Sequence, residues 1–104
     1  MIASDTNILL NIEDVFASKG RTKILHLLAI CGEMNISEIV KKTSLNHLNV
    51  KNHLKMLVKL NFIQEKEFGR IKIYRFKIEN KKAKSLKNLI EFWENKPLDW
   101  SFTM

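Results

Sequence analysis

The hydrophobic pattern of this chain changes its period twice, and these changes limit the folds that the chain can adopt. Up to Leu60 the apolar residues recur at the three- to four-residue spacing of amphipathic helices. From Phe62 the runs FIQEKE and IKIYRFKI alternate between apolar and polar residues, which is typical of β-strands. After Asn80 the helical spacing returns. The pattern predicts helices, then a β-hairpin with Gly69 at its tip, then a last helix, so the fold class is α+β and mainly α.

Four helices are predicted before the hairpin and one after it. Their expected bounds are residues 5–17, 21–31, 38–42, 46–60 and 80–96. Gly20 is expected to separate the first two helices, and Gly32 to end the second one in a left-handed C-cap. Asn35 or Ser37 is expected to cap the third helix, after a short extended piece, and Asn46 to cap the fourth. The third and fourth helices, joined by the short turn TSL, form a helix-turn-helix pattern.

Size and composition fit one compact domain over residues 1–104, since 45 % of the residues are hydrophobic and 28 % are charged. No apolar run approaches the ~20 residues that span a bilayer, and the first residues lack a secretory signal pattern, so we expect a cytoplasmic protein. The single cysteine, Cys31, cannot form an intrachain disulfide and is expected to be a small buried thiol, with pairing to its copy in a homodimer as the alternative. No phosphate-cradling glycine loop and no catalytic Cys/His or Ser/His/Asp spacing is present, so no enzyme is expected.

The chain is basic, and one predicted helix is free of acidic residues. Eighteen Lys and Arg against eleven Asp and Glu give a net charge of +7, which favours nucleic acid or an anionic membrane surface as a partner. No Asp or Glu occurs between Ile39 and Gln64. Helix 46–60 turns a basic, amide-bearing face outward if its apolar stripe faces the core, a stripe formed by Val50, Leu54 and Leu57. An ordinary solvated lysine face is the alternative, but such faces usually mix Glu with Lys.

The order helix, helix, helix-turn-helix, β-hairpin, helix is that of a winged helix. Two stretches, VKNHLKMLVKLNFI and GRIKIYRF, carry a more specific resemblance. Residues 18–78 resemble the winged-helix core of ArsR-like transcriptional regulators, with MarR-like regulators next nearest. The resemblance implies a homodimer with recognition helix 46–60 in the major groove and wing 66–72 at the minor groove or backbone. Helices 5–17 and 80–96 are then dimerisation helices, with apolar residues at Ile8, Ile12, Phe16, Leu86, Ile90 and Trp93.

The resemblance also implies which residues face DNA. Matching positions are His47, Asn49, Lys51, Asn52, Lys55 and Arg70. Leu48 joins them because it lies on the outward helix face, where it could meet a thymine methyl group or, alternatively, the neighbouring helix. Asn52 could read adenine, and simple solvation or a phosphate contact is the alternative. Arg70 beside Gly69 suits a narrow minor groove, and a merely exposed wing arginine is the alternative.

Metal sensing is not expected. Metal-sensing members of the family carry a Cys-x-Cys pair where this chain has ISEIVKK, and the segment KKAKSLKNLIEFWEN lacks their other ligands. His47 and His53 lie six residues apart, which does not suit a shared metal, so a phosphate contact or a structural role is expected for them. No cofactor is expected. Trp93 and Trp100 are expected in the core or the dimer interface.

These observations predict a sequence-specific transcriptional regulator that binds double-stranded DNA as a homodimer, most simply as a repressor. Two alternatives remain at this point. One is a winged helix that serves as a protein-interaction module, and the other is a non-specific architectural DNA-binding protein. A small-molecule effector leaves no short motif and is left open.

Overall fold

The computed structural model describes residues 12–94 of the 104-residue chain. The five helices and the hairpin occur in the predicted order, and a short strand is added between two helices. The elements are α2 (Ile12–Val15), α3 (Lys19–Cys31), β1 (Glu33–Asn35), α4 (Ile36–Thr43), α5 (His47–Lys59), β2 (Ile63–Phe68), β3 (Ile71–Phe76) and α6 (Lys81–Glu94). Of the helix predicted over residues 5–17, only the end lies within the described residues.

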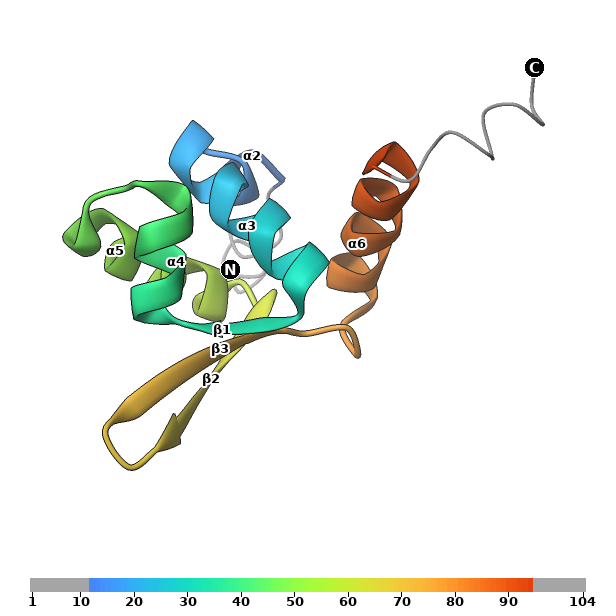
Figure 1. The fold of residues 1–104 in the computed structure, drawn as a ribbon. Coiled ribbons are helices and arrows are strands. Elements are labelled where there is room, and N and C mark those ends of the chain that lie inside the picture. The colour runs from blue at the N-terminus through green and yellow to red at the C-terminus, as the bar shows by residue number, and fades with distance from the viewer. Residues whose placement is uncertain (1–11, 95–104) are drawn as a thin grey trace, which may run out of the picture.

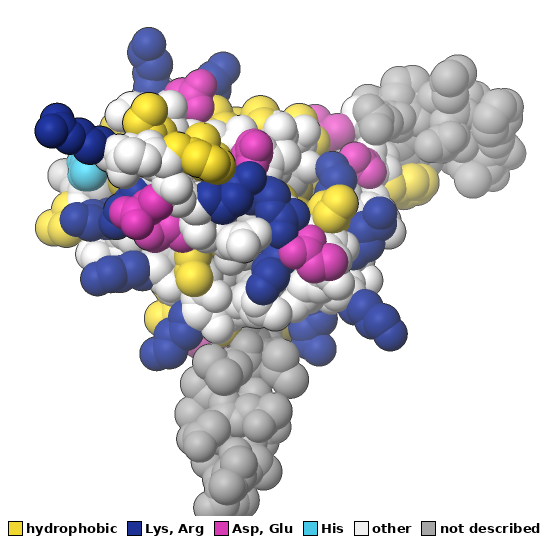
Figure 2. All heavy atoms as spheres, turned by 90° about the horizontal axis from the view of Figure 1, so that it is seen from below, with side chains coloured by type: hydrophobic (Ala, Val, Ile, Leu, Met, Phe, Trp, Pro, Cys, Tyr) yellow, Lys and Arg dark blue, Asp and Glu magenta, His cyan; other side chains and the backbone are white. Residues whose placement is uncertain are grey.

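Helices α2 to α5 lie above a small sheet, and α6 lies to one side, where it contacts α3 (Figure 1). The hairpin of β2 and β3 projects from the body, and its tip and α5 both lie to the left in this view, whereas α6 lies to the right. Seen from the sheet side, acidic side chains lie among numerous basic ones (Figure 2). No helix within residues 12–94 is long and apolar enough to cross a membrane.

The predicted hairpin is confirmed, and the sheet gains a third strand. The sheet is antiparallel with strand order β1-β3-β2. The hairpin register runs from Ile63 opposite Phe76 to Phe68 opposite Ile71, which leaves a two-residue turn at residues 69–70. Strand β1 pairs with the other edge of β3. This strand has only three residues, too few for a period-2 pattern to be visible in the sequence.

Side-chain caps fix the start of the helices. Asn35 and Glu38 form a reciprocal capping box at α4, with 2.9 Å from the Glu38 amide to Asn35 Oδ1 and 3.0 Å from the Asn35 amide to Glu38 Oε1. This confirms Asn35 rather than Ser37 as the cap. Ser18 caps α3, so Gly20 lies inside the first turn of that helix and does not separate two helices as predicted. A Cβ at Gly20 would lie 3.2 Å from His53 Nε2, which explains a glycine at a helical position.

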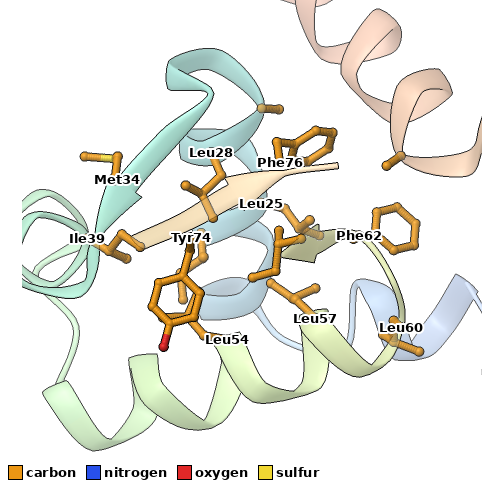
Figure 3. Packing of buried hydrophobic residues seen from close by; sticks show 14 of the residues in the cluster. Leu25, Leu28, Met34, Ile39, Leu54, Leu57, Leu60, Phe62, Tyr74 and Phe76 are labelled. Atoms are coloured by element: carbon orange, nitrogen blue, oxygen red, sulfur yellow. The ribbon is translucent and has the colours of Figure 1, made fainter. Parts of the chain in front are cut away.

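The core lies between α3, α4, α5 and the inner face of the sheet (Figure 3). The inward stripe predicted for α5 is confirmed, because its three members are at most 1 % exposed. Burial along α3 stops at Ala29, and Ile30 and Cys31 at the helix end are exposed. The prediction of a buried thiol at Cys31 is therefore wrong. Helical spacing places Cys31 near the core-facing side of α3, but Cys31 is the last residue of this helix and lies past the part that other elements cover.

Candidate nucleic-acid interface

The outward face of α5 carries all six helix residues predicted to face DNA. His47, Leu48, Asn49, Lys51, Asn52 and Lys55 are exposed. Leu48 is 62 % exposed, so it does not pack against the neighbouring helix, which was its alternative role. None of the residues from 39 to 64 is acidic, so no carboxylate of α5 or its flanks interrupts this face. We call these six residues the α5 face.

The start of α5 is fixed by Asn46, as predicted. Its side-chain oxygen accepts hydrogen bonds from the amides of Leu48 at 2.7 Å and Asn49 at 3.2 Å. This cap satisfies two amides of the first turn, which have no partner within the helix. The cap therefore holds the backbone of the first turn of α5, which carries the first residues of the α5 face.

The turn between α4 and α5 is held by hydrogen bonds of Thr43. Its hydroxyl donates to the Ile39 carbonyl at 2.7 Å and accepts from the Leu45 amide at 3.3 Å, and Thr43 is buried. Ser44 adopts a left-handed conformation with φ of 60° and ends α4. Lys23 on α3 donates to the Thr43 carbonyl at 3.2 Å. The angle between the two helices thus rests on a turn held by the buried, hydrogen-bonded Thr43.

The inner side of α5 contacts α3 through a polar pair that sequence reasoning did not find. Arg21 Nε donates to His53 Nδ1 at 3.4 Å, and Arg21 Nη1 donates to the Asp14 carbonyl. Burial, and then the nearby Arg21 guanidinium, lower the pKa of His53 below 6.5. Of the two roles predicted for His53, the structural one fits this position. The pair joins residues 32 positions apart in the chain, so no local spacing signals it.

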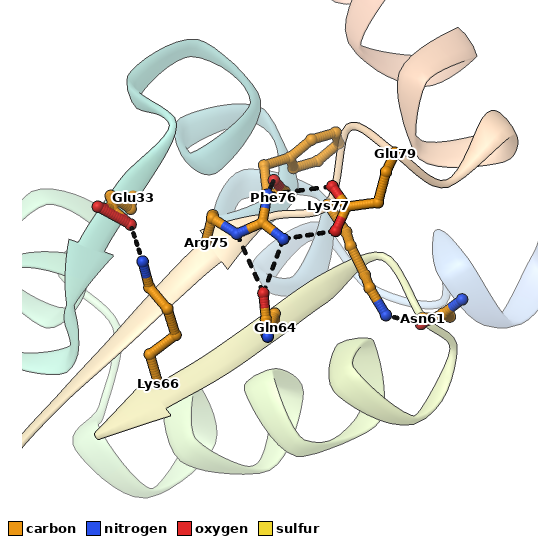
Figure 4. Close-up of polar contacts among 8 residues, drawn as sticks. All are labelled: Glu33, Asn61, Gln64, Lys66, Arg75, Phe76, Lys77 and Glu79. Carbon is orange, nitrogen blue, oxygen red and sulfur yellow. Dashed lines mark hydrogen bonds and ion pairs between the residues drawn. The ribbon is translucent and has the colours of Figure 1, made fainter. Parts of the chain in front are cut away.

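Polar contacts fasten the wing to the body of the protein (Figure 4). Arg75 donates to Gln64 at 2.7 and 3.1 Å, and it also forms an ion pair with Glu79 at 2.5 Å. This hydrogen bond with Arg75 holds the pKa of the Glu79 carboxyl at about 2. Lys77 donates to Asn61 at 2.6 Å, next to the end of α5. The base of the hairpin is thus fixed relative to the recognition helix.

On the inner face of the hairpin, Tyr74 donates its hydroxyl hydrogen to Glu65 at 3.1 Å. Burial raises the pKa of Tyr74 to about 12, and the hydrogen bond to Glu65 and the charges of Glu65 and Glu67 act in the same direction. Tyr74 is 4 % exposed and lies in the core cluster that also contains α5 residues. It joins the two wing strands to the core beneath α5.

The wing turn carries a cation that is free within the described chain. Arg70 is exposed and has no ion pair or hydrogen bond to any residue within 12–94. By contrast, Lys66 pairs with Glu33 at 3.0 Å, and Lys72 lies 3.6 Å from Glu65. Gly69, with φ of +64°, supplies the turn conformation that places Arg70 at the tip. Arg70 is therefore available for an anionic partner, as the minor-groove role requires, and the alternative of a merely exposed wing arginine fits the same position.

The residues predicted for the dimer interface fall into two groups. Ile12, Phe16 and Trp93 are exposed, with Ile12 at 65 % and Trp93 at 72 %. Leu86 and Ile90 are half-buried and pack against the core, and Ile8 lies outside the described residues. The expectation of a core position for Trp93 is thus not met, and Trp100 also lies outside the described residues. Leu86 contributes, together with Ile12 and Phe16, to a groove of about 410 Å³ between α2 and α6.

No three His, Cys, Asp or Glu side chains within residues 12–94 are grouped so that they could hold a metal ion. The sequence model of a family described as bacterial regulatory protein, arsR family, matches residues 18–65, which contain α3, α4, α5 and the start of β2. Over this segment the chain resembles ArsR-family winged helix-turn-helix regulators. Because proteins of this family are DNA-binding regulators, the predictions of DNA binding and of a non-enzymatic role are confirmed.

Solved structures show the same fold for this ArsR-like chain. HlyU from Vibrio cholerae N16961 superposes with a TM-score of 0.71 at 16 % identity, covering 90 % of this chain and 98 % of HlyU. The homodimeric winged helix-turn-helix DNA-binding domain of Mb0332 from Mycobacterium bovis gives 0.69 at 22 % identity, covering 93 % and 85 %. The transcriptional repressor PagR of Bacillus anthracis gives 0.66 at 22 % identity, covering 86 % and 97 %. No curated protein sequence matches the chain.

Proposed function

We propose that this ArsR-like protein regulates transcription by binding double-stranded DNA as a homodimer, with the α5 face in the major groove and the wing at the minor groove or backbone. The α5 face carries the proposal: it is exposed, basic, amide-bearing and free of carboxylates, and it lies on a helix whose start and turn are fixed. An α-helix fits the major groove, where the four base pairs present different hydrogen-bonding patterns.

The charged residues of α5 supply affinity. Duplex DNA carries about one negative charge per 1.7 Å of its axis, and lysines that neutralise phosphates release condensed counterions. Lys51 and Lys55 lie on the α5 face, and Lys59 is exposed at the end of the helix. An acidic residue among them would be repelled by phosphate, which gives a physical reason for the acid-free segment. Binding is expected to weaken steeply as salt is added.

Uncharged residues of the α5 face supply sequence preference. The side-chain amide of Asn52 can donate to adenine N7 or accept from N6, and both contacts together distinguish adenine from the other bases. Leu48 presents an apolar surface of the kind that contacts the thymine methyl group. Sites that contain A·T pairs in the major groove are therefore the proposed targets.

A second copy of the chain supplies the second recognition helix. The exposed apolar residues Ile12, Phe16 and Trp93 give the dimer an apolar surface to bury. The solved domain of Mb0332, described as homodimeric, supports this arrangement. A dimer carries twice +7, or +14, which favours attraction to DNA. Its half-sites should lie about one helical turn, ~34 Å, apart. Repression then follows if the occupied site excludes the transcription machinery.

Fluorescence anisotropy of a labelled duplex, measured against salt and against unlabelled random DNA, tests the proposal. Lys51→Glu should abolish binding, whereas Lys84→Glu on α6, which makes the same change in net charge at an exposed lysine, should bind like the native protein. Equal losses in both variants would show that only net charge matters, and would contradict a helix in the groove. Failure of any sequence to compete better than random DNA would favour the architectural alternative, and no binding at low salt would favour a protein-interaction module.

A further inference from the structure

Two large apolar side chains are exposed at the tip of the wing. Phe68 is 59 % exposed and Ile71 is 54 % exposed. They are paired across the strands, directly beside the two-residue turn that carries Arg70. Successive side chains of a strand alternate between faces, so Phe68 and Ile71 lie on the face opposite to the buried Tyr74. The core therefore gives no reason for an aromatic and a β-branched residue at this tip.

The charges around this pair set its chemistry. The wing cations Lys66, Lys72 and Arg75 each have an acidic partner, at 3.0, 3.6 and 2.5 Å respectively. Arg70, between Phe68 and Ile71, has no such partner among residues 12–94. The Lys66 ammonium also lies 5.8 Å from the centroid of the Phe68 ring, a cation–π distance that favours a defined position of the ring. The tip thus presents one free cation flanked by two apolar surfaces.

This combination differs from what a phosphate contact requires. A phosphate recognises cations and hydrogen-bond donors, and an apolar side chain placed against it gains nothing. The minor groove is different, because it is about 6 Å wide and admits an arginine together with apolar side chains, which several minor-groove proteins insert there. Arginine is attracted by the negative potential of a narrow, A·T-rich minor groove.

We propose that Phe68 and Ile71 enter the minor groove on either side of Arg70 and contact its apolar deoxyribose walls. The inference rests on the proposed function, because it requires α5 to place the wing on the same duplex. The arrangement permits this, since the wing tip and α5 lie toward one side of the molecule and α6 toward the other (Figure 1). The apolar pair then extends the recognised site beyond the bases that α5 reaches, toward A·T-rich flanks.

The experiment compares a variant of the apolar pair with a variant of the arginine, in the full-length chain. Phe68→Thr/Ile71→Thr keeps strand-forming residues at both positions and changes no charge. Its affinity for an A·T-flanked duplex should fall about tenfold, as expected for losing a partly buried aromatic contact, with the salt dependence unchanged. Arg70→Gln should instead reduce the salt slope by about one, because one cation that displaces counterions from the DNA is lost. Circular dichroism spectra that match the native protein show that each variant folds.

A minor-groove competitor locates the contact. Netropsin, which occupies A·T-rich minor grooves, should weaken binding of the native protein more than binding of Phe68→Thr/Ile71→Thr, which keeps only Arg70 in the groove. If the double variant binds like the native protein while Lys51→Glu does not bind, this inference is overturned and the proposed function stands. A lower affinity with unchanged sensitivity to netropsin would place the pair outside the minor groove and also overturn it. If no form binds DNA, the proposed function fails as well.

Discussion

The guanidinium of Arg21 on α3 and the imidazole of His53 on α5 are joined by a hydrogen bond of 3.4 Å from Nε to Nδ1. The same guanidinium donates to the Asp14 carbonyl at the end of α2. One side chain therefore connects three helices, and it contacts α5 at the half-buried His53, beside the exposed α5 face. Any change that removes the acceptor at His53 loosens the support of the recognition helix.

Protonation of His53 is such a change, because an imidazolium has no free acceptor and would face a second cation. The folded protein lowers the pKa of His53, so between that pKa and 6.5 the unfolded chain binds more protons than the folded one. The free energy of unfolding should therefore decrease as pH falls through 6.5. Urea unfolding at pH 7.5 and pH 5.5 measures the loss. His53→Asn keeps an acceptor that does not titrate, and should lose less stability over this interval; an equal loss would contradict the assignment.

Two substitutions at Asn46 distinguish an effect on stability from an effect on DNA binding. Asn46→Ala removes the acceptor for two amides of α5 and should lower the free energy of unfolding by about 1 kcal/mol. Asn46→Asp keeps a capping carboxylate, which is favourable at a helix N-terminus, so its thermal stability should match the native protein. Its added negative charge beside the α5 face should nevertheless weaken DNA binding. Native-like affinity of Asn46→Asp would contradict the placement of this helix end near phosphates.

Tyr74, the single tyrosine of the chain, reports on the wing. Its raised pKa means that the stabilisation is complete below pH 10 and is lost as pH rises toward about 12. Absorbance near 295 nm should show tyrosinate forming well above pH 10 in the native protein. Glu65→Gln removes a nearby negative charge and should move the midpoint downward, with burial still holding it above 10. A native midpoint at 10 would contradict the buried, hydrogen-bonded position.

A substitution on the exposed face of α6 tests whether this face forms the dimer interface. Trp93→Lys places a charge on a residue that is 72 % exposed in the single chain, so it should leave the fold intact but oppose burial of this face against a second copy. Sedimentation equilibrium should show a dimer for the native protein and a monomer for the variant, with weaker DNA binding. Lys84→Glu is the control on the same helix. A dimer that persists in Trp93→Lys would show that the interface lies elsewhere.

The sequence predicted the parts of the fold that depend on local patterns. Helical spacing placed the inward stripe of α5, Asn46 identified its start, and period-2 alternation around Gly69 located the hairpin. Three-residue β1 lacked enough alternation to be recognised, and its pairing with β3 joins segments about 40 positions apart. The Arg21–His53 contact is equally non-local. Cys31 shows a further limit, because spacing gives the direction of a side chain but not where the covering elements end.

In the candidate site, too, features that depend on local patterns could be predicted, and features that depend on contacts between distant segments could not. The exposure of the α5 face could be derived from the sequence, because the apolar stripe identifies the buried side of the helix and the other side must then face outward. The unpaired state of Arg70 could not, because it depends on which acids reach Lys66, Lys72 and Arg75 in the folded sheet. The exposure of Phe68 and Ile71 could not be predicted from the sequence, because period-2 alternation leads to the expectation that apolar strand residues face the core.

A residue-resolved NMR titration tests the central claim most directly. ¹⁵N-labelled native protein, titrated with a short A·T-rich duplex, shows which backbone amides change their environment without any substitution. Binding through α5 and the wing should give the largest changes at residues 47–55 of α5 and 69–71 of the wing turn, with the exposed residues of α6 little affected. Changes concentrated on α6, with the α5 face unchanged, would contradict it.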